Sequence, residues 1–337
     1  MNAYGAKSHH GVPVRPGMTV PLPGHLHTHQ EKLHELAELG YTDIWSAEAD
    51  GADAFTPLAM AAAWEPRLRL GTAIVPAYTR SPACFAQSVA TLADAAPGRF
   101  AIGIGSSSNV IVERWNNIPF ADPYKKVRDV VRFLNDALSG EKVAKSYDTF
   151  KVDGFKLGIR PEQKPQILVA ALREGMLRLA AREADGAIIN WLSPTDVARV
   201  AEVVHGAADG VPKEIVCRIF VCPSTNTEQV RTAAKFAIAA YLNVPVYAAF
   251  HAWLGRGDEL HDMWEAWKMG DRKAALAAIP DSVVDDIVVH GTPEQCRNRI
   301  REYFDNGVTT SSLAILPLDP ALNHWQAVRD LSPSAHN

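Results

Sequence analysis

The chain has 337 residues, enough for one α/β barrel or for two ordinary domains. Hydrophobic residues make up 47% and charged residues 21%, the balance of an ordinary soluble globular protein. The formal net charge of −4, without a basic stripe, argues against a nucleic-acid partner, and no apolar run is long enough to span a bilayer.

Eight short apolar segments follow an N-terminal stretch without periodicity. That stretch, residues 1–16, is expected to form a tail or an arm against a neighbour. Several of the eight segments, such as Phe100–Ile104, are apolar at successive positions, as expected of parallel strands buried on both faces. The predicted strands are Met18–Leu22, Asp43–Ala47, Leu68–Val75, Arg99–Gly105, Gln166–Ala171, Gly186–Trp191, Ile215–Cys222 and Ser312–Leu316.

Helix-start signals separate the predicted strands. Thr28 and Glu31 form a capping-box pattern, and four capping side chains precede a proline at the first helical position. After the second of these, Val127, Val130, Val131, Leu134 and Leu138 make one apolar stripe. The four capping residues are Ser81, Asp122, Ser193 and Thr292. Eight βα units with short links favour a closed (β/α)8 barrel, an α/β TIM-barrel fold, over an open sheet.

Two segments interrupt the βα pattern. Residues 141–158 have the pattern of a β-hairpin rather than a crossover helix. Residues 243–290 hold Trp253, Trp264 and Trp267 among charged residues and predict extra helices before the last strand. These helices either form a lid over the C-terminal face or cover the flank of the barrel. Residues 17–330 are expected to form a single domain.

The four cysteines give no disulfide or metal motif. Cys84, Cys217, Cys222 and Cys296 include no C-x-x-C pair, so free, buried thiols in a reducing cytoplasm are expected. The N-terminus lacks a charged region followed by an apolar one, and therefore predicts no signal peptide. The sequence indicates a cytoplasmic protein.

Five stretches carry a family resemblance when they are taken in order across residues 17–318. They are Gly40–Glu48 (GYTDIWSAE), Leu70–Pro82 (LGTAIVPAYTRSP), Gly98–Gly105 (GRFAIGIG), Glu183–Gly186 (EADG) with Asn190 and Trp191, and Gly291–Glu294 (GTPE). Together they resemble the bacterial luciferase-like monooxygenase family, in particular the branch that uses the deazaflavin coenzyme F-420. The resemblance implies a TIM barrel with the hairpin and late insertion described above.

The same resemblance implies an oxidoreductase that transfers hydride between F-420 and a small organic substrate, and a homodimer by family habit. An FMN-dependent monooxygenase of the same fold is the alternative. The resemblance also places a cis peptide bond at Ala73–Ile74, in a bulge that supports the coenzyme ring, and the coenzyme phosphate at the helix entry around Gly175. The implied coenzyme-binding residues are Ala73, Ile74, Gly105, Ser106, Ser107, Ala170, Ala171, Leu172, Arg173, Gly175, Met176, Asn190 and Trp191.

Two residues are candidates for catalysis, although hydride transfer requires few acidic or basic side chains from the protein. Glu48 is a carboxylate at the end of the second strand, either catalytic or bonded to a neighbouring N–H or arginine. Ser106 either contacts the ring or substrate or caps the next segment. Sugar-oxidising relatives have a histidine where this chain has Ala49 and a glutamate near residues 106–109. These departures argue against a sugar-phosphate dehydrogenase.

Two other function classes remain open. His25, His27 and His29 would point the same way on an extended segment, as in barrel amidohydrolases that hold zinc, and Asp319 matches a ligand after the last strand. The positions after the fifth and sixth strands offer no matching ligand, so the ligand set is incomplete. A barrel that binds the coenzyme without catalysis is the other possibility.

Overall fold

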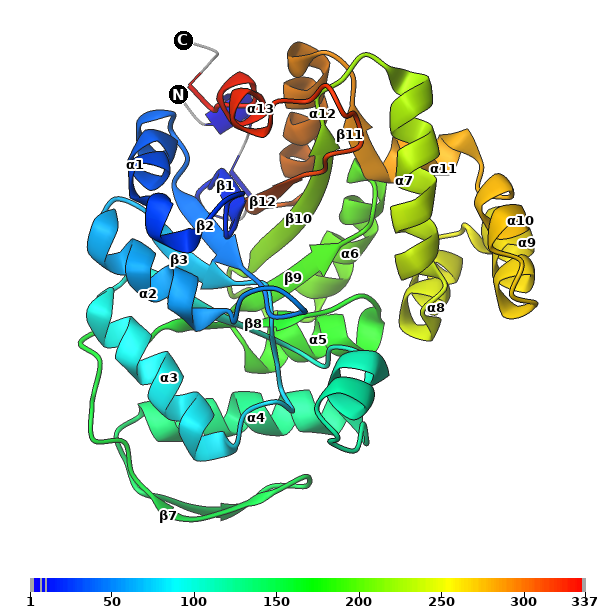
Figure 1. Cartoon of the computed structure of the whole chain (residues 1–337). Helices are drawn as coiled ribbons and strands as arrows, with labels where there is room; N and C mark the ends of the chain where they lie inside the picture. The colour runs from blue at the N-terminus through cyan, green and yellow to red at the C-terminus, as the bar shows by residue number, and fades with distance from the viewer. Residues whose placement is uncertain (1–2, 7, 10, 335–337) are drawn as a thin grey trace.

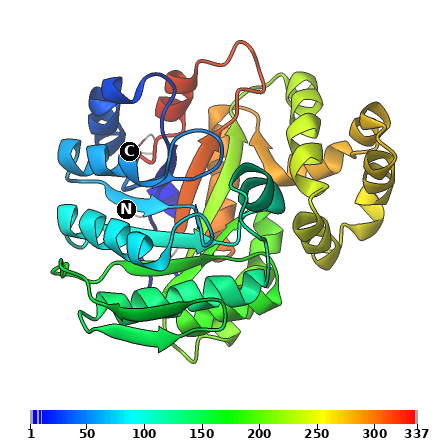
Figure 2. The same ribbon diagram turned by 60° about the horizontal axis from the view of Figure 1, so that its bottom comes forward.

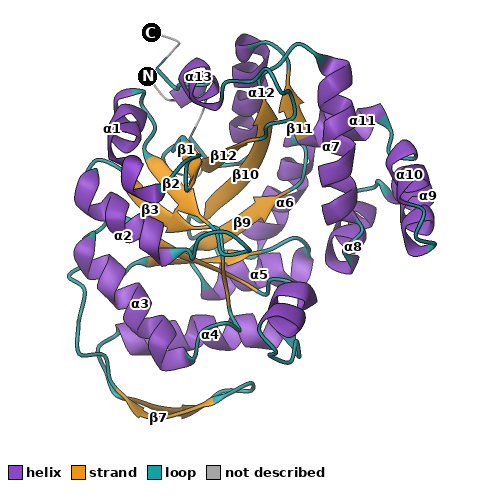
Figure 3. Cartoon of the chain, viewed as in Figure 1, coloured by secondary structure: helices purple, strands orange, loops and turns teal. Residues whose placement is uncertain are grey.

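The computed structural model describes residues 3–6, 8, 9 and 11–334. Its centre is a closed ring of eight parallel strand positions, in the order β1, β2, β3 with β4, β5, β8, β9, β10, β12 and back to β1 (Figures 1 and 3). The strands are β1 Gly17–Val20, β2 Asp43–Ser46, β3 Arg69–Thr72, β4 Val75–Pro76, β5 Phe100–Gly105, β8 Gln166–Ala170, β9 Gly186–Asn190, β10 Glu214–Cys222 and β12 Thr310–Ile315. The predicted closed barrel is confirmed.

Each predicted barrel strand is present, with small differences at the ends. The first strand ends at Val20 rather than Leu22, because Pro21 has no N–H to donate to a neighbouring strand. The third strand is interrupted after Thr72 and resumes at Val75. Between the two parts lies the Ala73–Ile74 peptide bond, which is cis as the family resemblance implies.

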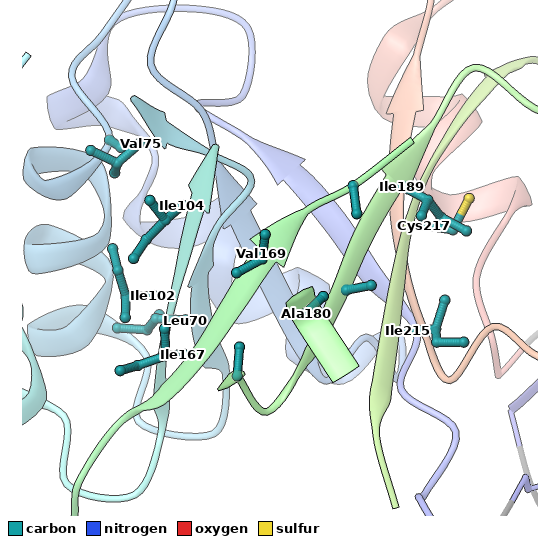
Figure 4. Close-up of a cluster of buried hydrophobic side chains, with 14 of the residues drawn as sticks. Leu70, Val75, Ile102, Ile104, Ile167, Val169, Ala180, Ile189, Ile215 and Cys217 are labelled. Atoms are coloured by element: carbon teal, nitrogen blue, oxygen red, sulfur yellow. The ribbon is translucent and has the colours of Figure 1, made fainter. Parts of the chain in front are cut away.

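Helices surround the ring and cover its outer face (Figure 2). Outward-facing side chains such as Ile102 on β5 and Val169 on β8 belong to the main hydrophobic core between strands and helices (Figure 4). The predicted stripe on α4 is fully part of this core. The helices are α1 Gln30–Glu38, α2 Phe55–Trp64, α3 Pro82–Ala95, α4 Pro123–Leu138, α5 Glu174–Glu183, α6 Pro194–Gly206, α7 Thr227–Leu242, α8 Pro245–Trp253, α9 Gly257–Lys268, α10 Arg272–Ala277, α11 Asp281–Ile287, α12 Pro293–Asp305 and α13 His324–Asp330.

The inside of the ring is filled in layers, as in other TIM barrels. At the N-terminal end, Arg69 lies between Asp43 and Glu214, and all three side chains are buried. Above them Trp45 packs with Leu168, Ile188 and Val216. The floor and middle of the barrel are therefore closed, and only the C-terminal strand ends are left to bind a ligand.

Both predicted insertions are confirmed as structural elements. Strands β6 Val143–Ser146 and β7 Lys151–Phe155 form the antiparallel hairpin. Buried Asp129 on α4 fixes its turn by accepting hydrogen bonds from Thr149 N and Oγ1, at 2.8 and 3.0 Å. Residues 243–290 form α8 to α11, followed by the short strand β11 Val288–His290, which was not predicted and pairs with the end of β10.

The inserted helices pack mainly beside the barrel. Helices α9 and α10 extend away from it, next to α7 (Figure 1). Trp264 on α9 donates a hydrogen bond to Leu242 O on α7, at 2.9 Å. Helix α8 reaches a strand end through Tyr247, whose hydroxyl bonds to Asn190 at the end of β9. Most of the insertion therefore covers the flank of the barrel, which is one of the two predicted arrangements, rather than forming a lid over its C-terminal face.

Two of the predicted helix caps form and three do not. Ser193 and Thr292 each make a complete capping box. Thr28 is a wrong prediction, because Leu26–Thr28 is itself a 3-10 turn whose Thr28 hydroxyl donates back to His25 O. Ser81 and Asp122 precede their prolines as predicted, but neither side chain makes a capping hydrogen bond.

The chain ends and cysteines complete the description. Tyr4, in a 3-10 turn over Ala3–Gly5, is buried and donates a hydrogen bond to Leu331 O at 2.8 Å, so this part of the N-terminal segment packs on its own chain. All four cysteines are free as predicted, but Cys84 is exposed on α3.

Among the described residues no single helix is long and apolar enough to cross a membrane, while the bent pair α7 and α8 passes that test of length and composition.

Candidate active site

The carboxyl ends of the barrel strands bring several predicted coenzyme-binding residues together. Ala73, Ile74 and Ala170 are partly buried and border the interior cluster of the barrel. A Cβ atom at Gly105 would lie 3.0 Å from the Ala170 Cβ and 3.0 Å from the Ile74 Cδ1. Three strands therefore form one continuous apolar wall at residues 74, 105 and 170, in which position 105 tolerates only a hydrogen atom without displacement.

Glu48 lies next to this wall and is paired with an arginine. Its backbone N–H donates to Ile74 O at 3.1 Å, which ties the end of β2 to the bulge after β3. Its Oε2 accepts a short hydrogen bond from Arg80 Nη1, and both side chains are mostly buried. The Arg80 guanidinium in turn lies 4.8 Å from the centre of the Phe55 ring, a cation–π distance. The Glu48 carboxylate is therefore held in one orientation by Arg80, and a bond to an arginine is one of the arrangements considered from the sequence.

The serines after β5 have different surroundings. Ser108 Oγ accepts a hydrogen bond from Ile111 N at 3.3 Å, so Ser108 caps the π-helical turn Val110–Trp115. Ser107 has a positive φ of 60°, which turns the chain away from the strand. Ser106 is half-buried, and its hydroxyl makes only a long 3.4 Å contact to Ser107 O. Ser106 and Ser107 are thus the serines of this run whose hydroxyls make no short hydrogen bond among the described residues.

The entry to α5 is open to an anion. The helix begins at Glu174, with Arg173 as its N-cap in extended conformation and no side chain capping the first turn. Gly175 lies inside that first turn and has no positive φ, so its backbone is ordinary helix. A Cβ there would meet no atom within 4 Å. Of the other predicted residues at this helix entry, Leu172 and Met176 are half-buried and Ala171 is buried.

Asn190 and Trp191 end β9 in contact with α7 and α8. Trp191 has a φ of 54° and is buried, with its ring stacked on Phe220 at 3.9 Å and tilted against Tyr241 at 4.9 Å. The Trp191 ring therefore joins the barrel rim to α7. Asn190 Oδ1 accepts a hydrogen bond from Tyr247 Oη at 3.1 Å. Burial raises the pKa of Tyr247 to about 12, so its hydroxyl stays a donor at neutral pH.

The predicted alternative of a zinc site is wrong. It assumed an extended segment, but Leu26–Thr28 is a 3-10 turn. His25 and His27 are exposed with stacked rings 5.7 Å apart, while His29 is buried. No group of three or more possible ligands that could hold a metal ion lies within the part of the chain that the structure describes.

A family model described as luciferase-like monooxygenase matches residues 7–310, which is most of the chain. The chain belongs to this family. The match confirms the resemblance found in the sequence, and the closed barrel confirms the fold class that goes with it.

Curated relatives of this luciferase-like protein include two reductases that align over most of both chains. The 5,10-methylenetetrahydromethanopterin reductase of Methanolobus tindarius is 29% identical over 297 residues, which are 83% of this chain and 87% of the relative. The enzyme of the same name from Archaeoglobus fulgidus is 27% identical over 289 residues, covering 82% and 86%.

Solved structures with the same fold include enzymes of two coenzyme classes. The coenzyme F-420-dependent tetrahydromethanopterin reductase of Methanopyrus kandleri has a TM-score of 0.75 at 20% identity, covering 95% of this chain and 97% of that one. An F-420-dependent secondary alcohol dehydrogenase with an F-420–acetone adduct scores 0.76 at 15% identity, covering 95% and 98%. The FMN complex of the oxygenating constituent of 3,6-diketocamphane monooxygenase from Pseudomonas putida scores 0.64 at 16%, covering 95% and 97%. The prediction that this luciferase-like protein is an enzyme is confirmed, since the family and these relatives are named as reductases, dehydrogenases and monooxygenases.

Three residues at this site of the luciferase-like barrel were missed from the sequence. Arg80 was quoted only as part of a resembling stretch, and Tyr247 lies in the insertion, whose position relative to the strands has no sequence signal. Arg218 did have a signal, because it is the one charged residue in the predicted apolar strand Ile215–Cys222. The sequence thus marked Arg218 as unusual, but the face to which it points became clear only from the closed ring.

Proposed function

We propose that this protein is an F-420-dependent oxidoreductase that moves hydride between the deazaflavin and a small organic substrate at the barrel mouth. The observation that carries the proposal is the alignment, over more than four-fifths of the chain, with reductases whose solved namesake depends on F-420. When bound, the coenzyme supplies the carbon that takes or gives the hydride. The protein has to hold, orient and shield it.

The residues at the strand ends fit a flat tricyclic ring. The wall of Ile74, Gly105 and Ala170 is apolar and has no protruding side chain at its centre. A planar ring needs such a surface to lie against, and a glycine permits the closest approach of ring and backbone. Ser106, directly after Gly105, offers a hydroxyl at the edge of this wall.

The first turn of α5 fits the coenzyme phosphate. The unpaired N–H groups of this turn and the positive end of the helix dipole favour an anion. The Arg173 side chain is exposed next to them and is free to add a charge-assisted hydrogen bond. Ala170 of the wall ends β8, and α5 begins only four residues later, at Glu174. One elongated ligand could therefore place its ring on the wall and its phosphate at the helix entry.

An FMN-dependent monooxygenase is the second candidate. Its support is the FMN-bound structural neighbour, which superimposes less closely than the two F-420-dependent enzymes, with TM-scores of 0.64 against 0.75 and 0.76. The predicted homodimer and the cytoplasmic location stay predictions, as do the individual roles of the site residues.

A fluorescence titration of the purified protein with F-420 and with FMN tests the proposal. We expect F-420 fluorescence to change on saturable binding and FMN to bind at least roughly tenfold more weakly. The reduced coenzyme is then mixed with a panel of enones, quinones and imines, and its reoxidation is followed by absorbance. Binding of FMN alone would reject the F-420 assignment, and tight F-420 binding without turnover of any compound would show that the substrate lies outside the panel.

Replacing Gly105 by valine is expected to weaken F-420 binding by at least roughly tenfold, or about 1.4 kcal/mol. The added side chain would press on Ala170 and Ile74 at 3.0 Å and project from the wall. Overpacking of this kind also lowers stability, by roughly 1–3 kcal/mol. The measurement is the F-420 dissociation constant, with the thermal midpoint beside it.

The matched control for this prediction is Gly158→Val. Gly158 also has a φ outside the positive region, and a Cβ there would meet no atom within 4 Å. This variant should bind F-420 as the wild type does. Equal coenzyme affinity in the two variants would show that the ring does not lie on the wall at Gly105.

A further inference from the structure

Arg218 points into the barrel near its mouth. On β10, Val216 belongs to the interior cluster, whereas Ile215, Cys217 and Ile219 belong to the core outside the ring. Because side chains alternate along a strand, Arg218 shares the inward face with Val216 and lies one layer closer to the C-terminal end. Its register partner on β9 is Asn190, the residue bonded to Tyr247.

The Arg218 guanidinium has no carboxylate partner. Its Nε is buried and makes no hydrogen bond, and within residues 3–6, 8, 9 and 11–334 the group has no ion pair. The contact that it does make is with the face of the Phe220 ring, at 5.2 Å from its centre. Burial lowers the pKa of Arg218, while Tyr241 and Tyr247 oppose this effect. Arginine nevertheless stays charged in proteins, so this half-buried positive charge has no counter-ion among the described residues.

The lower arginine of the same barrel shows the contrast. Arg69 is buried at the closed end, and its guanidinium bonds to Asp43, Glu214 and Gln166. A buried charge of this kind is normally paired, because desolvation without a partner is costly. Among the described residues, the fold therefore provides carboxylate partners for the arginine at the closed end and none for the arginine at the open end.

We propose that Arg218 binds an anionic oxygen group of the substrate, with the Asn190 amide and the Tyr247 hydroxyl beside it. The proposal rests on the proposed function only in taking the coenzyme ring to lie on the opposite wall, at Gly105. A planar guanidinium recognises a carboxylate or a similar oxyanion through two parallel hydrogen bonds. The substrate class is thus an oxyanion-bearing organic molecule, not a neutral ketone or an aliphatic alcohol.

The experiment compares benzoate with its neutral counterpart benzamide as probes. Their binding is measured by isothermal titration on the full chain, in the wild type and in Arg218→Lys, Arg218→Met and Arg301→Gln. Arg301 is an exposed arginine on α12 and serves as the matched control for loss of one positive charge. We expect the wild type and the Arg301 variant to bind benzoate at least roughly tenfold more tightly than benzamide. Arg218→Met should lose this preference, and Arg218→Lys should keep part of it.

A second readout separates a binding role from a structural one. Because the half-buried Arg218 makes no ion pair or hydrogen bond among the described residues, ligand-free Arg218→Met should melt at or above the midpoint of the wild type. An arginine that stabilised the fold would instead give a lower midpoint on replacement. A lower midpoint, or equal benzoate and benzamide binding by the wild type, would overturn the proposal.

The coenzyme titration distinguishes this proposal from the function on which it rests. F-420 affinity should be the same in Arg218→Met and the wild type to within about twofold. A large loss of F-420 affinity with benzoate binding retained would assign Arg218 to the coenzyme and overturn the proposal. If the wild type binds benzoate through Arg218 but does not bind F-420, the proposed function fails and the oxyanion site stands.

Discussion

Replacing Arg69 by methionine is expected to lower the free energy of unfolding by about 3–5 kcal/mol at neutral pH. Arg69 Nη1 donates to Asp43 Oδ1 at 2.9 Å and to Glu214 Oε1 at 2.8 Å, and Nη2 donates to Glu214 Oε2 at 2.8 Å. All three side chains are buried at the floor of the barrel. Methionine fills much of the volume but leaves Glu214 without its ion pair and Asp43 with only the longer contact to Arg15, at 3.7 Å.

The pH dependence of this loss has a defined sign. Burial opposes the charged form of Glu214, yet Arg69 holds the pKa of that carboxyl below its ordinary value of 4.5. In the wild type, the resulting stabilisation is present above 4.5 and is lost as the pH falls toward the folded-state pKa. In Arg69→Met the burial effect remains without the arginine, so the pKa of Glu214 rises above 4.5. The destabilisation should therefore shrink between pH 7 and about pH 4.5, as the buried carboxyls take up protons.

Urea unfolding at pH 7 and at about pH 4.5 measures this difference. Arg132→Gln is the control, because Arg132 makes an ion pair of comparable geometry with Glu183 but on the exposed face of α4. Its loss should cost at most about 1 kcal/mol at either pH. A variant at position 69 no less stable than this control would show that the buried cluster does not hold the barrel floor together.

The barrel could be predicted from the sequence because its strands are local patterns. A segment such as Phe100–Ile104 is apolar at successive positions, which is typical of a strand buried on both faces. The hairpin and the late insertion were predictable for the same reason, since they break the pattern. The strand β11 was not, because three residues, Val288–His290, carry too little periodicity.

The polar interior of the barrel could not be predicted in the same way. Arg69 and Glu214 are 145 positions apart, and which charged residues inside strands meet is decided only when the ring closes. The coenzyme wall came from the family resemblance, since Ile74, Gly105 and Ala170 have no chemical signature of their own. The histidines near residue 27 gave a wrong metal hypothesis because a one-turn helix replaced the assumed extended segment.

Replacing Glu48 by glutamine is expected to lower turnover by about 100-fold, while F-420 binding changes by less than about twofold. The Glu48 carboxylate lies at the end of β2, beside the wall that is proposed to hold the coenzyme. Arg80 holds its Oε2, and its Oε1 has no hydrogen-bond partner among the described residues. We take Glu48 as the candidate for exchanging a proton with the substrate as hydride moves, since the next residue, Ala49, offers neither an acid nor a base.

The comparison that decides Glu48's role is with Arg80→Lys, which keeps a positive charge but loses the fork geometry of the guanidinium. If Glu48 exchanges the proton, Arg80→Lys should retain most of the turnover and shift its pH profile, whereas Glu48→Gln should lose turnover at every pH. If Glu48 only anchors the loop after β2, both variants should instead lose thermal stability and coenzyme affinity together. Turnover of Glu48→Gln close to that of the wild type would remove Glu48 from the chemistry and leave the proton exchange to the Ser106 hydroxyl or to water.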